Sequence, residues 1–398
     1  MPHLLVIGGS DAGISAGLRA REIDPSWDVT LVVADAYPNF SICGLPFFIS
    51  GETPDWRSLA HRTVDEIEAA GIRLLLNHTA TAIDAGAQQV AVVDDAGAEQ
   101  RLSYDRLVIG TGARPAPPAA PGVELAGVYA LHTMDDSFRV HRHVTEEKPR
   151  SATIIGSGYI GLEMADALAH RGLEVTLLVR SDHAFRTAVD PALGDVVEDE
   201  LTRHGVRVVK GAQIAGIRRQ GGSLVVEGPA LSADAEIVLA VTGVQPASEL
   251  GAAAGISTGV RGALRVNRRM ETNLPHVYAA GDCVETWHRL TGDYTYLPLG
   301  TTAHKQGRVA GENAVGGNRE FQGSVGTQVV KVFDLAVARA GLRDADAAAA
   351  GFDPLSVDLR VWDHKAYYPG ARELLIRLTG DRRTGRLLGG QIVGHWQG

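Results

Sequence analysis

The chain has 398 residues, of which 45% are hydrophobic and 21% charged. These values are typical of a globular protein with two or three domains. Its formal net charge of −9 disfavours broad nucleic-acid binding, which needs a basic surface. Two cysteines in this length give no disulfide framework and suit a reducing compartment. Since neither a signal peptide nor a membrane span is apparent, we predict a cytoplasmic protein without membrane or nucleic-acid partners.

A strand–turn–helix–strand pattern occurs twice along the chain. The first copy has an apolar strand at 4–7, a glycine-rich turn at 8–13, a helical stretch at 14–22 and a second strand at 29–33. The second copy repeats this order at 153–155, 156–161, 162–170 and 174–179. One such turn is a weak signal because it can be a plain tight connection. Two copies in the same setting predict two dinucleotide-binding units.

Each glycine of such a turn has its own purpose. The first allows the tight turn, the second lets the backbone approach a pyrophosphate, and the third lets helix and strand pack closely. The free N–H groups at the helix start then face the phosphates. The first turn departs from the pattern because Ser10 stands at its second position. The predicted contacts are Gly8, Ser10, Asp11, Ala12 and Gly13 in the first turn, and Gly156, Gly158, Tyr159, Ile160 and Gly161 in the second.

Two later predicted strands also end in a turn that contains glycine and a small or acidic residue. They could be ordinary strand ends, or backbone edges that touch a dinucleotide, with Asp282 binding a sugar or ribityl hydroxyl. With the two turns, they resemble landmarks of the two-dinucleotide-binding-domain flavoproteins, the pyridine nucleotide–disulfide oxidoreductases. The additional cofactor-binding residues that this resemblance implies are Thr111, Gly112, Arg114, Gly243, Gly281 and Asp282.

The resemblance covers essentially the whole chain and implies an α/β fold. An FAD domain at 1–117 and 248–322 would be split by an NAD(P) domain at 118–247. A C-terminal α/β dimerisation segment would occupy 323–398, and it looks shorter than is usual for the family. Homodimers are expected through this segment.

The segment from Asn39 to Phe48 is similar to the single-cysteine branch of the family, with Cys43 as the redox residue. That branch holds coenzyme A disulfide reductases, NADH oxidases and NADH peroxidases. Oxidases and peroxidases of the branch usually carry histidine where this chain has Asp11, which disfavours oxygen or peroxide as the main acceptor. The segment 364–370 looks like the coenzyme A disulfide reductase segment, in which a tyrosine of the partner subunit approaches the cysteine; Tyr367 and Tyr368 are the candidates.

Cys43 precedes a predicted helix that has Pro46 in its first turn, and a helix N-terminus lowers the pKa of a nearby thiol. The alternative is that Cys43 is a small buried hydrophobe. For Cys283, packing is the favoured interpretation. Arg19 and Arg21 on the first helix could meet the phosphates of a coenzyme A tail or be solvated.

The coenzyme is predicted from the end of the second strand, where NAD-binding units place an acid and NADP-binding units an arginine. This chain has Arg180, Ser181 and Arg186 there, a pattern that resembles the NADPH site of glutathione reductase; a solvated arginine face is the alternative for Arg186. On the FAD side, Asp35 could reach the ribose. The family resemblance implies that Glu163 lies near the nicotinamide and flavin and that Lys305 lies near the flavin; for Glu163, favourable interaction with the helix dipole is the alternative. His304 has no second ligand at metal spacing, so no metal is expected.

These observations predict an FAD-dependent enzyme that passes a hydride from NADPH through FAD to Cys43 and reduces a low-molecular-weight disulfide or persulfide, such as coenzyme A disulfide. One alternative is an NAD(P)H oxidase or peroxidase that cycles Cys43 through a sulfenic acid. A second is a redox-sensing or electron-transfer flavoprotein without disulfide turnover.

Overall fold

The computed structural model describes residues 1–397. The chain forms two compact units: the first comprises Met1–Ser41, Arg57–Arg114 and Val244–Ser324, and the second comprises Ile42–Trp56, Pro115–Gly243 and the chain from Val325 onward. Among the described residues, no helix has the length and apolar character needed to cross a membrane.

The first unit is built on a five-stranded parallel sheet in the order β18-β7-β1-β2-β3. The residues Leu4, Leu5 and Val6 of the central strand are fully buried, because a parallel sheet that is covered on both faces needs apolar side chains at consecutive positions. The strands are β1 (His3–Ile7), β2 (Asp28–Val32), β3 (Ile72–Leu75), β7 (Arg106–Ile109) and β18 (Val277–Ala279).

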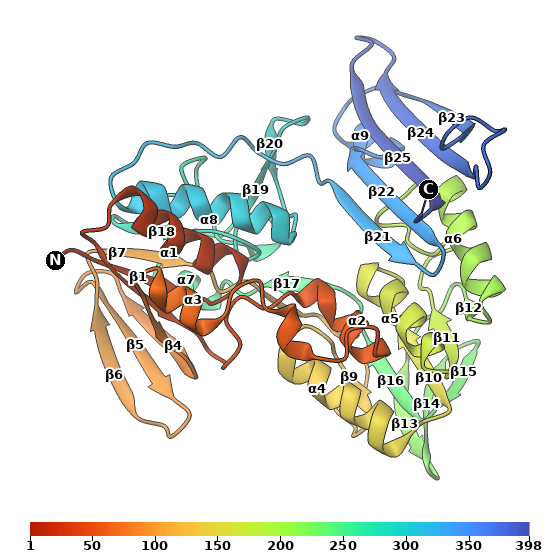
Figure 1. Cartoon of the computed structure of the whole chain (residues 1–398), viewed down its shortest axis with the longest axis horizontal. Coiled ribbons are helices and arrows are strands. Elements are labelled where there is room, and N and C mark those ends of the chain that lie inside the picture. Colours follow the sequence, from red (N-terminus) through yellow and green to blue (C-terminus); the bar gives the residue numbers. More distant parts are fainter. Residues whose placement is uncertain (398) are drawn as a thin grey trace. The chain divides into compact units, whose positions relative to one another are not determined.

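Helices α1 (Asp11–Ile23) and α8 (Gly300–Ala314) of the first unit lie side by side (Figure 1). Glycine makes the contact possible: a Cβ on Gly307 would lie 2.2 Å from the Ala12 carbonyl oxygen, and one on Gly311 would lie 2.0 Å from that of Ala16. Two helices about three hundred residues apart in sequence therefore touch backbone to backbone.

A three-stranded antiparallel sheet stands between β3 and β7 in the chain, formed by β4 (His78–Asp84), β5 (Gln89–Asp94) and β6 (Glu99–Ser103). The remaining elements of this part of the chain are short. They are η2 (Trp56–Leu59), α3 (Val64–Ala69), β8 (Ala113–Pro115), β17 (Val244–Pro246), α7 (Glu249–Ala253), η4 (Val260–Gly262), β19 (Thr286–His288) and β20 (Asp293–Thr295).

The second unit repeats this plan. Its five-stranded sheet has the order β12-β11-β10-β16-β9, and another three-stranded antiparallel sheet, β13-β14-β15, stands between β12 and β16 in the chain. The sheet strands are β9 (Val128–Tyr129), β10 (Ser151–Ile155), β11 (Glu174–Leu178), β12 (Arg207–Val209) and β16 (Ile237–Ala240); the others are β13 (Gly216–Gln220), β14 (Ser223–Gly228) and β15 (Leu231–Ala235). Its main helices are α5 (Tyr159–His170) and α6 (Pro191–Arg203).

The short segment that carries Cys43 belongs to the second unit. It forms η1 (Ile42–Gly44) and α2 (Leu45–Ser50), and packs against α4 (Met134–Arg142), which is followed by a π-helical turn, η3 (His143–Glu147). The rings of Phe48 and Phe138 meet edge to face at 5.9 Å. Arg171, at the end of α5, donates a hydrogen bond of 2.8 Å to the Ile49 carbonyl.

The C-terminal part is a five-stranded antiparallel sheet in the order β21-β22-β25-β24-β23. It contacts α5 and α6: Lys331 lies 3.1 Å from Asp166, and the Asp334 N–H donates to Glu200 at 2.8 Å. The predicted α/β class with two dinucleotide-binding folds and a C-terminal segment is thus confirmed. The elements are β21 (Gln328–Val332), β22 (Leu335–Gly341), α9 (Asp344–Ala349), β23 (Pro354–Trp362), β24 (Glu373–Asp381) and β25 (Leu387–His395).

Candidate active site

The glycine-rich turn of the first unit is forced by the chain itself at its first and third glycines. Gly8 has φ +116°, and a Cβ there would lie 2.1 Å from the Gly110 carbonyl oxygen. A Cβ on Gly13 would lie 1.9 Å from the carbonyl oxygen of Gly8. Ser10, by contrast, has ordinary extended angles (φ −101°, ψ −162°), so the second position needs no glycine for its backbone.

The turn of the second unit has nearly the same geometry. Gly156 has φ +115°, and a Cβ on Gly161 would lie 1.9 Å from the Gly156 carbonyl oxygen. Gly158 differs from both, because a Cβ there would meet no atom of the described chain within 4 Å. The space beside Gly158 is open to a ligand, as close approach to a pyrophosphate requires.

The helices that follow the two turns begin without a side-chain cap at Ser10 and at Gly158. Helices α3 and α4, by contrast, each start with a capping box. The first N–H groups of α1 and α5 are therefore left for another acceptor, and phosphate oxygens are suitable ones. These features fit an FAD diphosphate at the first turn and an NAD(P) diphosphate at the second.

Two carboxyl groups lie near the first turn. Burial, together with the charge of Asp11, raises the pKa of Asp282 to about 7. Burial also raises the pKa of Asp11, against the opposing charges of His61 and His304. Helix α8 begins close by, since a Cβ on Gly300 would lie 2.6 Å from Asp11 Oδ2. Asp11 and Asp282 are thus brought together beside the predicted FAD diphosphate.

The other residues predicted to bind FAD have different hydrogen-bond and ion-pair partners. The Thr111 hydroxyl donates to the Ala247 carbonyl at 2.6 Å, and Asp35 Oδ1 accepts the Tyr37 N–H at 2.8 Å. Arg114 forms an ion pair with Glu249. Gly112 and Gly281 have φ +70° and +86°. Lys305 is exposed on α8.

The two cysteines differ in environment. Cys43 is exposed, and Cys283 is fully buried. The Cys283 thiol lies 3.4 Å from the Ala280 carbonyl oxygen and 3.6 Å from that of Ile109, and burial raises its pKa. Cys283 is therefore a packing residue, whereas Cys43 is exposed just before the six-residue helix α2.

Helix α5 carries two buried groups after the second turn. Burial, and secondarily the charge of Asp166, raises the pKa of Glu163 to about 7. Burial raises the pKa of Tyr159 to about 12. The Tyr159 ring packs edge to face on Phe185 at 4.7 Å. The second turn is thus in contact with the loop between β11 and α6.

That loop, residues 179–190, carries the predicted phosphate-binding arginines. Arg180 and Arg186 are both exposed. Within residues 1–397, no acceptor is paired with either guanidinium. The Ser181 hydroxyl donates to the His183 carbonyl at 2.8 Å. Gly243 is also in the second unit, with φ +122°, and a Cβ there would meet no described atom within 4 Å.

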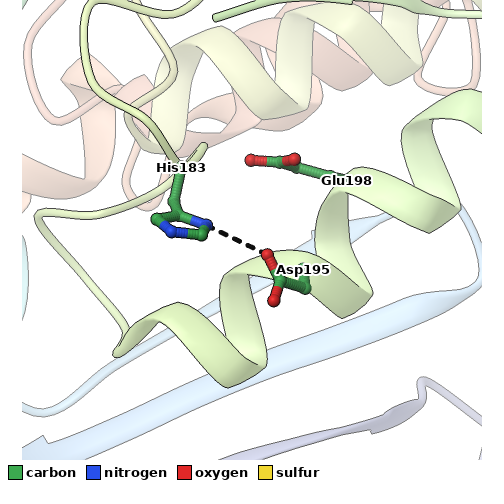
Figure 2. Close-up of side chains that lie close together, drawn as sticks. All are labelled: His183, Asp195 and Glu198. Atoms are coloured by element: carbon green, nitrogen blue, oxygen red, sulfur yellow. Dashed lines mark hydrogen bonds and ion pairs between the residues drawn. The ribbon is translucent and has the colours of Figure 1, made fainter.

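Figure 2 shows His183, Asp195 and Glu198 gathered between this loop and α6. His183 Nδ1 lies 3.0 Å from Asp195 Oδ1. One Glu198 oxygen accepts the Ala184 N–H at 2.6 Å, and the other pairs with Lys210 at 3.0 Å. Glu198 accepts from a loop N–H and pairs with Lys210, so the cluster braces the loop against α6.

Neither arginine considered for a coenzyme A tail is open to one. Arg19 pairs with Glu312 at 2.6 Å and with Glu22 at 2.8 Å. Arg21 donates to the carbonyls of Pro25 and Trp27 at 2.5 and 2.8 Å. Both guanidinium groups therefore hold the first unit together.

Tyr367 and Tyr368 lie in the loop between β23 and β24 and are 76% and 54% exposed. Their rings stack at 5.1 Å. The edge strand β23 exposes apolar side chains at alternate positions, and therefore on one face of the sheet: Leu355, Val357, Leu359 and Val361. These side chains form an exposed apolar row on the edge strand of the C-terminal sheet.

Sequence reasoning missed two arginines from the C-terminal part that reach the loop 179–190. Arg343 donates to the Arg186 carbonyl, and Arg339 to the Thr187 carbonyl at 3.4 Å. No local pattern could have indicated them, because each partner lies more than 150 positions away. Sequence reasoning also missed the left-handed conformation of Phe185 (φ +58°).

Comparison with known proteins agrees with this geometry. The family model of the pyridine nucleotide-disulphide oxidoreductases matches residues 2–307, and the model of that family's dimerisation domain matches residues 327–398. The chain belongs to the pyridine nucleotide-disulphide oxidoreductase family. It is therefore an FAD-dependent enzyme that uses NAD(P)H.

Three proteins to which the chain is similar carry two kinds of activity in their names, persulfide reductase and water-forming oxidase. The NAD(P)H coenzyme A polysulfide/persulfide reductase of Pyrococcus horikoshii is 34% identical over 98% of this chain and 87% of its own length. The structure of an NAD-dependent persulfide reductase from A. fulgidus has a TM-score of 0.95 and 35% identity, covering 99% of this chain and 74% of that one. An engineered water-forming NADPH oxidase derived from a Lactobacillus brevis enzyme, bound to NADPH, has a TM-score of 0.95 and 26% identity, covering 99% and 87%.

Proposed function

We propose that this enzyme oxidises NADPH and reduces low-molecular-weight disulfides or persulfides, such as coenzyme A disulfide, at Cys43. The observation that carries the proposal is the contrast between the exposed Cys43 thiol and the fully buried Cys283 in a family of disulfide oxidoreductases. The similarity to persulfide reductases supports the sulfur substrate.

In this mechanism, the Cys43 thiolate attacks one sulfur of the substrate R–S–S–R′, forms the mixed disulfide Cys43–S–S–R, and releases R′–S⁻. FAD, which the first glycine-rich turn would hold, would supply the two-electron chemistry that links hydride transfer from NADPH to reopening of this mixed disulfide. Cys43 returns as a thiolate and R–SH leaves with one proton. The sum is NADPH, a proton and R–S–S–R′ converted to NADP⁺, R–SH and R′–SH.

The remaining predicted residues are assigned by unit. The first turn, with Asp35, Thr111, Gly112, Gly281, Asp282 and Lys305, would hold FAD. The second turn and Gly243 would hold the coenzyme. Glu163 would lie near the nicotinamide, where its pKa of about 7 suits the exchange of a proton at neutral pH. Arg114 is the weakest member of the set because its guanidinium is already paired.

The coenzyme preference follows from the loop after β11. The engineered NADPH oxidase was made with substitutions that place alanine, arginine and serine at three consecutive positions, and arginine five positions after the serine. This chain reads Val179, Arg180, Ser181, and has Arg186 five positions after Ser181. Two exposed guanidinium groups that have no acceptor within the described chain suit the 2′-phosphate of NADPH.

A homodimer is proposed through the C-terminal sheet, in agreement with its match to a dimerisation domain. The apolar face of β23 would be covered, and the loop with Tyr367 and Tyr368 would reach the partner subunit's cysteine. The exposure of both rings in one chain fits side chains that complete a site in another.

Turnover of oxygen is the competing function, favoured by the likeness to a water-forming oxidase. It would cycle Cys43 through a sulfenic acid. Asp11, at the position where oxidases of the branch usually carry histidine, speaks against it, as does the similarity to persulfide reductases.

The test is anaerobic NADPH oxidation with coenzyme A disulfide or a coenzyme A persulfide, with Cys43→Ser compared to wild type. Cys283→Ala is the matched control, since it removes the buried thiol. We expect wild type and control to turn over and Cys43→Ser to lose at least about a thousandfold in kcat. Equal turnover by the Cys43→Ser variant would refute the assignment, and turnover with oxygen alone would establish the oxidase.

A further inference from the structure

We propose that the choice of NADPH depends on two positioning residues that do not touch the coenzyme, Glu198 on α6 and Arg343 at the start of α9. Both hold the loop 179–190 in one conformation and so preorganise Arg180 and Arg186. The inference rests on the proposed NADPH preference and extends it to a residue of the dimerisation domain.

Glu198 holds the loop from the side of α6. Its carboxylate is largely buried, at 13% exposure. It accepts the N–H of Ala184, two residues before Arg186, at 2.6 Å. Lys210 at 3.0 Å fixes the other oxygen, and the neighbouring His183–Asp195 pair adds a second tie between loop and helix (Figure 2).

Arg343 holds the loop from the C-terminal part. Its guanidinium donates to the backbone carbonyl of Arg186 itself. A fork of two bonds to Asp346, at 2.8 and 2.7 Å, sets its orientation. Arg339, whose side chain is only 9% exposed, donates to the next carbonyl along, that of Thr187. The segment with Arg186 is thus tied to a different domain from the one that carries the turn.

Phe185 shows that this conformation is imposed from outside. A bulky residue rarely adopts a φ of +58°, and such strain persists only where the surroundings enforce it. Phe185 is 1% exposed and packs on Tyr159 of the second turn. The ties to Ala184 on one side and Arg186 on the other bracket this residue directly.

Holding the loop in one conformation should affect only the binding of the coenzyme's 2′-phosphate. A preorganised arginine loses less conformational entropy when it binds a phosphate, so its affinity is higher. NADH lacks the 2′-phosphate and gains nothing from the arginines. Loss of either tie should therefore weaken NADPH binding selectively.

The experiment compares the holoenzyme with Glu198→Ala and Arg343→Ala. Arg382→Ala is the matched control, because Arg382 pairs with Asp353 in the same domain and, within the described residues, has no bond to the loop. Calorimetry measures the Kd of 2′,5′-ADP, which carries the 2′-phosphate, and of 5′-AMP, which lacks it. Steady-state assays measure KM and kcat with NADPH and NADH.

We expect each variant to weaken 2′,5′-ADP and raise KM for NADPH by about fivefold to tenfold, with 5′-AMP, NADH and kcat within about twofold. The conservative Glu198→Gln, which keeps an acceptor for Ala184, should recover most of the 2′,5′-ADP affinity. The control should match wild type.

Equal weakening of both nucleotides would reveal a general structural role and overturn the inference. A preference for 2′,5′-ADP over 5′-AMP that survives both substitutions would also overturn the inference. In that case the proposed NADPH preference would still hold, but it would not depend on Glu198 or Arg343. A wild type without any preference for 2′,5′-ADP would overturn the NADPH assignment, and this inference with it.

Discussion

The turn at Gly8–Gly13 and the turn at Gly156–Gly161 have first glycines with φ values of +116° and +115°. In both, a Cβ on the third glycine would lie 1.9 Å from the carbonyl oxygen of the first. They differ at the second position, where Ser10 stands in one and Gly158 borders open space in the other. The backbone of such a turn is thus set by two of its glycines, and the middle position is left to suit the ligand.

The loops that follow the second strands differ more. After β2, the Asp35 side chain accepts the N–H of Tyr37 and its backbone carbonyl accepts the N–H of Asn77, so this loop is tied within the first unit. After β11, the loop 179–190 is tied to α6 and to the C-terminal part. The duplicated unit therefore keeps its turn geometry, while the loop beside it differs between the two copies, and in the proposed function this loop selects the coenzyme.

The largest expected effect is on the two first glycines. The new Cβ would lie 2.1 Å from a carbonyl oxygen in Gly8→Ala and 2.5 Å from one in Gly156→Ala. Each substitution should lower the free energy of unfolding by about 2–4 kcal/mol. Urea denaturation of the holoenzyme measures this. Wild-type stability in either variant would show that the turn can relax.

The double variant Arg180→Ala, Arg186→Ala should raise KM for NADPH about a hundredfold and leave NADH nearly unchanged, because two charged phosphate contacts are lost. Steady-state kinetics with both coenzymes measure the ratio. Arg382→Ala again provides the control. If the ratio of the KM values for NADPH and NADH does not change, these arginines form a solvated surface and the 2′-phosphate is bound elsewhere.

Gly158→Ala should weaken NADPH about tenfold and change stability by less than about 0.5 kcal/mol, since the new methyl group meets only open space in the free protein. FAD retention should not change. The reciprocal Ser10→Gly, in the other turn, should leave the Kd of 2′,5′-ADP unchanged. A large loss of stability in Gly158→Ala would contradict the view that this glycine serves only the ligand.

The smallest effect is the pH dependence of stability from Glu163. Its pKa in the folded protein, about 7, is raised above the unfolded value, so the carboxyl favours folding at low pH and this contribution is lost as the pH rises to about 7. The free energy of unfolding of Glu163→Gln should not show this decline with pH, and the two proteins should then differ by on the order of 1 kcal/mol. Thermal unfolding between pH 5 and about 8 measures it, and parallel pH profiles would contradict the burial argument.

The repeat and its chemistry could be predicted because glycine spacing and apolar runs are local. Helix starts were less accurate: α1 begins at Asp11 and α5 at Tyr159, three residues before the expected starts, because the last residues of each turn are already helical. Family likeness supplied the residue roles, and these remain proposals for the individual side chains.

Long-range contacts could not be predicted. The pairing of Arg343 with the Arg186 carbonyl, the internal use of Arg19 and Arg21, and the grouping of Cys43 with the second unit all join distant segments. A guanidinium in a sequence looks the same whether it binds a phosphate or a carbonyl. Only packing decides between these uses.

The close fit of α8 on α1 has a consequence for the order in which the protein is built. Strand β1 emerges first during synthesis, but the glycines that meet α1 lie at 307 and 311, and β18 begins only at Val277. At ordinary elongation rates the ribosome needs tens of seconds to reach them. The 115–243 segment has been synthesised by then. The middle of the chain can therefore fold before β1 and α1 have the elements, β18 and α8, that complete their packing.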